Sequence, residues 1–318
     1  MMMKPFKLQP QYREYIWGGK RLRPQAERTA EAWVVYAEDM IADGPIRGKS
    51  LAEAALIAKE TLLGSPVVEK TGLKFPLLIK IMDCADWLSL QVHPNNSQAL
   101  ELEGEGHFGK MEGWYIVDAG PGAQLINGFS SGTSLAQIEA TVGTRAMLDI
   151  VQYVDMRTGD SMLIRPGTLH ALGPGLMVYE VQQTSDITYR VYDWDRPKKA
   201  GRDLHLAQAK RVLDPSAGGS SSIKHASGKD ALLLFSCEFF ALRKLNGTPS
   251  PMALDTAGVS FHCLTMVQGG GEVRGNGWER TLAQYETLVI PADCGEFRLA
   301  QGDFICLDAF VPDSGSES

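Results

Sequence analysis

The chain has few cysteines, and they are too widely spaced to suggest a structure stabilised by disulfides or thiolate-bound metal. Its five cysteines, Cys84, Cys237, Cys263, Cys294 and Cys306, are an odd number, and none forms a CxxC pair. A disulfide framework and a thiolate zinc site are therefore not expected. Free thiols in a reducing compartment are the simpler interpretation.

The sequence also lacks a long apolar run and an excess of basic charge. No segment approaches the roughly 18 apolar residues of a membrane span, and residues 1–10 lack the apolar core of a secretory signal. The formal net charge is −7, whereas nucleic-acid binders normally present a basic face. We therefore expect a cytoplasmic protein with no membrane or nucleic-acid partner. A small anionic ligand stays compatible, because a few local cations outweigh a mildly acidic surface.

The chain contains 33 glycines and 16 prolines, which interrupt the sequence at short intervals. Short apolar or alternating runs lie between them, and such runs separated by turn residues predict an all-β sandwich or barrel. These runs are residues 75–82, 87–92, 114–117, 162–164, 176–181 and 187–192.

A few helices interrupt this pattern. Ser50 and Glu53 form a capping-box sequence, and apolar residues follow at helical spacing until Gly64. Ser134 begins a similar pattern, and residues 204–213 are a third candidate. The oligomeric state is not decided by any of these features.

Residues 217–222 (AGGSSS) have the composition of a flexible linker and predict a boundary between domains 1–222 and 223–318. Residues 159–170 and 285–295 weakly resemble each other, since each strand-like run leads through a proline into a turn. The second segment has Gly295 where the first has His170. This favours two related β units, of which only the first holds a ligand; chance similarity of short strand–turn segments is the alternative.

The most informative histidine is His93, in residues 88–94 (LSLQVHP). On a strand, Ser89, Gln91 and His93 share one face and three aliphatic residues share the other. Such a strand is typical of a polar cavity wall, although a solvent-exposed polar face gives the same alternation.

Other polar candidates lie on separate segments. Lys110 and Glu112 share a face, which is also typical of a solvated surface ion pair. His170 follows a Pro-Gly turn, where a histidine often caps a loop. No His-X-His or His–Glu spacing links these residues, so a metal site requires ligands that converge from separate strands. His107 lies in a Gly-rich loop near Lys110, where we expect a solvated residue, with a substrate contact as the alternative; His205, His225 and His262 have no matched partner in the sequence.

Taken in order, several segments resemble the type I mannose-6-phosphate isomerases, or phosphomannose isomerases, in their short bacterial form. The matching segments are residues 15–19, 31–33, 76–80, 88–94, 109–116, 166–171 and 180–190. The resemblance implies a mainly β double cupin, that is, jelly-roll β-barrels with a few short helices near the first barrel. Residues 1–222 are then the catalytic metal-binding domain, and residues 223–318 are a degenerate metal-free cupin-like domain.

The resemblance also implies a metal site formed by Gln91, His93, Glu112 and His170. One Zn²⁺ per chain is expected, although the same nitrogen and oxygen ligands accept Mn²⁺, Co²⁺ or Fe²⁺. These ligands carry a charge of −1, so a divalent ion leaves a net positive centre that favours an enediolate-like transition state.

The implied activity interconverts mannose 6-phosphate and fructose 6-phosphate through a cis-enediol. Arg190 matches the catalytic arginine, and Glu180 matches an acidic residue suited to proton transfer or to orienting a water. Lys80, Ser89 and Lys110 match residues near the sugar phosphate.

Two other functions fit parts of this evidence. A sugar-phosphate sensor on the same fold would keep the basic residues without needing a metal. A cupin oxygenase would use two histidines and one carboxylate, which His93, Glu112 and His170 supply. Isomerase activity that is lost with a chelator and restored by zinc distinguishes an isomerase from the sensor. Oxygen consumption with a sugar tests for the oxygenase.

Overall fold

The computed structural model describes residues 3–196, 202–218, 224–225 and 230–313. Contacts divide the chain into two compact units, neither of which is one continuous stretch. The first comprises residues 1–12, 32–81 and 226–318, and the second comprises residues 13–31 and 82–225. Strands β2 (Gln11–Arg13), β3 (Glu31–Val35) and β4 (Leu77–Asp83) contain three of the points where the division between the units cuts the chain, and the fourth follows residue 225.

The predicted domains 1–222 and 223–318 stay a prediction, and the boundary between them lies outside the described residues. The compact units divide the chain differently because N-terminal segments belong with the C-terminal strands. For example, β1 (Phe6–Lys7) pairs with β20 (Thr287–Ile290), with Phe6 opposite Val289. A linker-like composition cannot reveal such pairing between distant segments.

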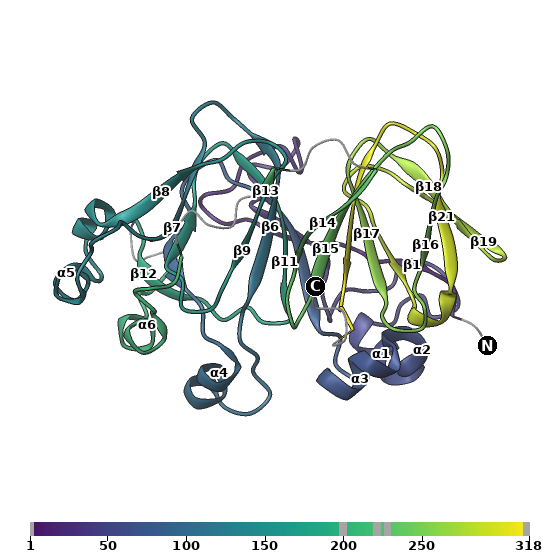
Figure 1. Cartoon of the computed structure of the whole chain (residues 1–318), viewed down its shortest axis with the longest axis horizontal. Helices are drawn as coiled ribbons and strands as arrows, with labels where there is room; N and C mark the ends of the chain where they lie inside the picture. The colour runs from purple at the N-terminus through teal and green to yellow at the C-terminus, as the bar shows by residue number, and fades with distance from the viewer. Residues whose placement is uncertain (1–2, 197–201, 219–223, 226–229, 314–318) are drawn as a thin grey trace. The chain divides into compact units, whose positions relative to one another are not determined.

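The second unit contains two sets of antiparallel strands (Figure 1). One set follows the order β12-β5-β10-β7-β8, and the other follows the order β13-β9-β6-β11. The strands of the first set are β5 (Leu90–Val92), β7 (Gln124–Phe129), β8 (Val151–Asp155), β10 (His170–Leu172) and β12 (Tyr189–Tyr192). Those of the second are β6 (Glu112–Ala119), β9 (Asp160–Ile164), β11 (Leu176–Gln183) and β13 (Lys224–His225). The helices of this unit are α4 (Asn96–Glu103), α5 (Leu135–Thr141), η1 (Arg145–Asp149) and α6 (Leu206–Val212).

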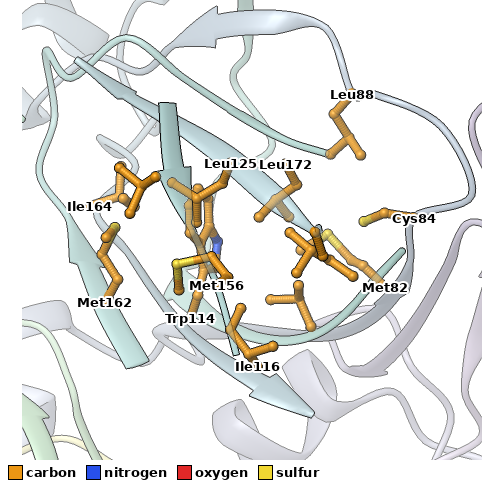
Figure 2. Close-up of a cluster of buried hydrophobic side chains, with 14 of the residues drawn as sticks. Met82, Cys84, Leu88, Trp114, Ile116, Leu125, Met156, Met162, Ile164 and Leu172 are labelled. Atoms are coloured by element: carbon orange, nitrogen blue, oxygen red, sulfur yellow. The ribbon is translucent and has the colours of Figure 1, made fainter. Parts of the chain in front are cut away.

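A buried apolar cluster lies between strands of the second unit (Figure 2). Trp114, Leu125, Met162 and Ile164 belong to it and are at most 1% exposed. Burying side chains of this size contributes roughly 1.5–3 kcal/mol each relative to exposure. The cluster therefore helps to fix β6, β10 and β11, whereas the apolar residues of β5 and β12 belong to a second buried cluster of the same unit.

The first unit contains a six-stranded antiparallel sheet in the order β1-β20-β17-β22-β15-β14 and a four-stranded sheet in the order β16-β21-β18-β19. Its further strands are β14 (Ala231–Ser236), β15 (Ala241–Asn246), β16 (Met252–Asp255), β17 (His262–Gln268), β18 (Gly271–Gly275), β19 (Trp278–Leu282), β21 (Glu296–Leu299) and β22 (Ile305–Phe310). Its helices are α1 (Leu51–Ala58), α2 (Glu60–Leu63), α3 (Ser65–Thr71) and η3 (Ala292–Cys294). The prediction of a mainly β chain with two cupin-type barrels and a few short helices is confirmed.

The predicted capping box is confirmed at the start of α1. The Ser50 hydroxyl accepts a hydrogen bond from the Glu53 amide at 3.1 Å, and the Glu53 carboxylate accepts one from the Ser50 amide at 2.8 Å. The pattern predicted one run up to Gly64, but the chain breaks at Lys59, which has φ of 46°. This break starts α2 in a new direction, and Leu62 and Leu63 are fully buried there.

All five cysteines are free, as expected. No helix in the described part of the chain is long and apolar enough to cross a membrane.

In the first unit, the buried carboxylate of Asp308 has two side-chain hydrogen-bond partners. Its oxygens accept hydrogen bonds from His262 Nδ1 at 2.8 Å and from Arg243 Nη2 at 2.6 Å. Burial by itself raises the pKa of Asp308, but these two partners outweigh that effect and hold it below its usual 3.8. His262 therefore has a partner that the sequence did not reveal.

We expect Asp308→Asn to lower the free energy of unfolding at neutral pH by roughly 2–4 kcal/mol, because it removes the buried negative charge that pairs with Arg243 and accepts from His262. Since the folded-state pKa is lowered, the carboxylate stabilises the protein above pH 3.8, and this contribution is lost as the pH falls through the folded-state pKa. Urea unfolding at several pH values measures both effects.

Asp303→Asn, at an exposed position of the same unit, is the control and should change stability little. Equal stability of Asp308→Asn and the parent protein at neutral pH would contradict the prediction. A stability difference that does not shrink in acid would contradict its electrostatic cause.

Candidate metal centre and active site

Strand register places four polar side chains in one row across a sheet of the second unit. Gln91 on β5 lies opposite Arg190 on β12 and also opposite His170 on β10. His170 in turn lies opposite Asn127 on β7. Directly opposed residues of antiparallel strands present their side chains on the same face. The sheet therefore aligns Arg190, Gln91, His170 and Asn127 on one face.

Three potential metal ligands converge beside this row. The ligand atoms of His93, Glu112 and His170 all lie within 4.8 Å of one another, and all three residues are buried. The Nε2 atoms of His93 and His170 each lie 3.4 Å from one oxygen of the Glu112 carboxylate. The convergence of residues from separate strands, which sequence spacing alone did not establish, is thus present.

Backbone carbonyls orient both imidazoles of the group. His93 Nδ1 lies 2.7 Å from the Ile187 carbonyl oxygen, and His170 Nδ1 lies 2.9 Å from that of Thr168. Each carbonyl accepts the Nδ1 proton of a neutral imidazole, which leaves the Nε2 lone pair facing the other ligands. Burial lowers the pKa of His170, although Glu112 acts in the opposite direction, and the neutral ligand form is favoured.

Gln91 completes the predicted ligand set. Its amide nitrogen lies 3.2 Å from His170 Nε2 and 3.5 Å from His93 Nε2, and its amide oxygen accepts a hydrogen bond from Ser89 at 3.4 Å. Rotation of the amide by half a turn exchanges oxygen and nitrogen and directs the oxygen toward the histidines. The donor set of two imidazoles, one carboxylate and one amide suits an N/O-ligated divalent metal.

Lys110 lies directly against this group and is buried. Its Nζ is 3.2 Å from His93 Nε2 and forms an ion pair with Glu112. Ser89 is also buried and contacts the group through Gln91. The structure thus brings two of the three predicted phosphate-binding residues next to the candidate ligands.

Lys80 lies on β4, in the part of the chain that belongs to the first unit. It is buried, and its Nζ is 5.2 Å from the centre of the Trp33 ring. This distance is within the range of a cation–π contact. Its role at the phosphate stays a prediction.

Glu180 lies beside the ligands on the neighbouring strand β11. It is opposite Trp114, whose indole N–H donates a 2.7 Å hydrogen bond to its carboxylate. The same indole ring meets His170 edge-on, with ring centres 5.4 Å apart. Trp114 therefore connects the predicted acidic residue to a candidate metal ligand.

Gln182 was not predicted as a site residue, although the alternation along β11 puts it on the same face as Glu180. It lies opposite Glu112 and is fully buried. Its amide nitrogen donates to the Ser185 carbonyl, and its amide oxygen has no hydrogen-bond partner among the described residues. Only the pairing of β11 with β6 reveals its position beside a ligand. Asn127 was missed for the same reason.

Two of the remaining histidines, His205 and His262, have partners that the sequence did not reveal. His107 is exposed on its loop, as expected. His205 does have a partner, because its Nδ1 accepts a 3.2 Å hydrogen bond from the backbone amide of Arg190. No pattern in the sequence pointed to this contact.

Comparison with known proteins agrees with this geometry. A family model described as phosphomannose isomerase type I, catalytic domain, matches residues 5–110. The chain is 34% identical over 304 residues to a mannose-6-phosphate isomerase of Streptococcus mutans serotype c, covering 91% of this chain and 93% of that protein. It is 30% identical over 313 residues to the mannose-6-phosphate isomerase ManA of Bacillus subtilis, covering 94% and 96%.

A solved structure gives the same result. The crystal structure of the mannose 6-phosphate isomerase from Bacillus subtilis superposes with a TM-score of 0.85 at 30% identity, covering 96% of this chain and 99% of that one. The fold and the converging ligands define a cupin with a candidate metal centre. The chain belongs to the family of type I mannose-6-phosphate isomerases, which confirms the resemblance found in the sequence.

We expect Glu112→Gln to reduce metal binding at least about tenfold, because it removes the only carboxylate from the ligand set. Metal analysis after dialysis against a defined zinc concentration measures this loss. Glu139→Gln changes an exposed carboxylate of α5 in the same way and should bind metal normally. Full metal content in Glu112→Gln would show that the metal is held elsewhere.

Proposed function

We propose that this protein is a mannose-6-phosphate isomerase that interconverts mannose 6-phosphate and fructose 6-phosphate. Membership in the isomerase family supports the reaction. The single observation that carries the site assignment is the convergence of His93, Glu112 and His170 within 4.8 Å. The substrate is a small sugar phosphate, and the five free cysteines are compatible with work in a reducing cytoplasm.

We propose further that one Zn²⁺ per chain is held by Gln91, His93, Glu112 and His170. When bound, the ion would act as a Lewis acid that polarises substrate oxygens. The oriented Nε2 atoms of both histidines support this assignment. Other divalent metals fit the same ligands, so metal analysis must accompany any assay.

The reaction moves one carbon-bound proton and one hydroxyl proton and needs no external oxidant. A base removes the proton from C2 of the aldose, the oxygens at C1 and C2 exchange a proton in the cis-enediol, and the carbon proton returns at C1. Arg190, on the same face as Gln91 and His170, stabilises the negative charge that develops on these oxygens. Glu180 transfers a proton or orients a water, and its hydrogen bond from Trp114 fixes its carboxylate.

Lys110 and Ser89 lie where they can bind an anionic substrate. Lys110 is 3% exposed and lies beside the ligand group, so water would screen a charge-assisted hydrogen bond from it to an anionic substrate only weakly. Lys80 is included in this proposal on the basis of the family resemblance. The sugar-phosphate sensor is not favoured, because such a protein does not need the converging ligands.

A cupin oxygenase uses a similar ligand set but needs no cations at the substrate. The family membership and the buried Lys110 beside the ligands argue against it. Oxygen consumption by the metal-loaded protein with mannose 6-phosphate would support the oxygenase and refute the proposal.

We expect the purified protein to convert mannose 6-phosphate in an assay coupled to fructose 6-phosphate. Activity should disappear with a chelator and return with zinc, because charge stabilisation at the oxygens would be lost and restored. Metal analysis of the same samples links activity to occupancy. Full activity in a sample without metal would refute the metal-dependent mechanism.

Arg190→Ala should lower turnover by about 100-fold or more, because it removes a positive charge from the developing enediolate. Metal content should stay near that of the parent protein, since Arg190 is not among the proposed ligands. Arg190→Lys is the matched variant that keeps the charge and should recover part of the activity. Equal losses of metal and of activity would contradict a catalytic role for Arg190.

A further inference from the structure

Among the described residues, the strand that carries Arg190 has one strand neighbour in its sheet. β12 is the first strand in the order β12-β5-β10-β7-β8, so β5 pairs with one edge only. The outward edge of such a strand presents unpaired backbone N–H and C=O groups. An edge strand is a poor support for a catalytic side chain unless another segment satisfies these groups.

His205 satisfies both outward backbone groups of Arg190. The Arg190 amide donates to His205 Nδ1 at 3.2 Å, and the His205 amide donates to the Arg190 carbonyl oxygen at 2.9 Å. These two bonds replace the missing neighbouring strand at this one residue. The first bond comes from a side chain, so it depends on the identity of residue 205.

The segments on either side of this contact are anchored as well. Arg202 donates two hydrogen bonds to the Asp193 carboxylate, at 2.7 and 2.9 Å. Arg196 donates to the same carboxylate at 3.2 Å. Asp193 therefore holds the residues just after Arg190 to the residues just before His205.

The guanidinium group of Arg190 depends on this backbone support. Its Nε is buried and has no hydrogen-bond partner among the described residues. The side chain is therefore not fixed at Nε by a bond of its own, and its position follows from the backbone of residue 190.

We propose that His205 is a positioning residue that fixes the backbone of Arg190 and so aims its guanidinium group at the reacting oxygens. The catalytic part of this proposal depends on the proposed isomerase function, whereas the contact between His205 and the Arg190 backbone does not. Misplacing a catalytic group by about 1 Å can cost up to about 100-fold in rate. The contact is therefore expected to affect turnover more than substrate binding.

The test compares His205→Ala with His205→Asn and His205→Gln. The Asn side chain places an acceptor atom as far from the backbone as Nδ1, whereas the Gln acceptor lies one bond further out. His205→Ala and His205→Gln should lower kcat about tenfold or more, with KM changed less than about threefold and metal content unchanged. His205→Asn should recover kcat to within about threefold of the parent protein.

Tyr192→Phe is the matched control on the same strand. It removes a side-chain hydrogen bond, from Tyr192 to Asp195 at 2.9 Å, without changing the contact to Arg190. Its kcat should stay within about twofold of the parent value. A similar loss in this variant would indicate a general weakening of β12 and would overturn the specific role of His205.

Amide hydrogen exchange of the Arg190 amide is the readout that does not depend on activity. Exchange should be faster in His205→Ala and His205→Gln than in the parent, and His205→Asn should restore protection. Exchange of the Arg190 amide that is unchanged in His205→Ala and His205→Gln would overturn the proposal. Equal kcat and equal exchange in His205→Gln and His205→Asn would also overturn it, and this comparison holds even if His205→Ala fails to fold. If exchange of the Arg190 amide changes in these variants but the parent protein does not isomerise mannose 6-phosphate, the contact to His205 is supported and the proposed function is refuted.

Discussion

The site depends on the register of one short strand, β5. Gln91 lies opposite His170 on one side and Arg190 on the other, so this register sets three side chains of the site at once. Because side chains alternate along a strand, a slip by one residue would turn Gln91 and His93 to the opposite face. Leu90 and Val92, which are fully buried, would then face the polar residues of the site. Their burial therefore protects the register.

The second requirement is that buried charges have partners. Glu112 is fully buried, and the cost of removing a carboxylate from water is large unless cations or donors surround it. Lys110 and two imidazoles provide that environment. The first unit also buries a carboxylate, Asp308, and there Arg243 and His262 are its partners. In the second unit, the Nε2 lone pairs of His93 and His170 face a common centre with Glu112. In the first unit, the donors of Arg243 and His262 satisfy the carboxylate of Asp308.

Orientation of the polar groups comes from residues around them. Carbonyl oxygens of Ile187 and Thr168 set the two imidazoles, and Trp114 sets Glu180. Each of these contacts fixes one rotatable group before substrate arrives. Preorganised donors and charges of this kind stabilise a transition state without reorganisation during the reaction. The site thus combines a rigid sheet with individually oriented side chains.

Much of the fold and the family followed from the sequence. Glycines and prolines between short apolar runs predicted a mainly β chain, and Ser50 with Glu53 predicted a helix start, because these signals depend only on local chemistry. Alternation placed Gln91 and His93 on one face. The ordered motifs, as a family resemblance, added Glu112, His170 and Arg190.

Only the tertiary structure decided how these residues meet. Pairing between strands distant in sequence brought Gln182 opposite Glu112 and joined β1 to β20, and no local pattern specifies such pairs. It also gave His205 its contact with Arg190 and His262 its contact with Asp308. The physical reason is that periodicity fixes the face on which a side chain lies, whereas its partner is set by register and by packing of the whole sheet.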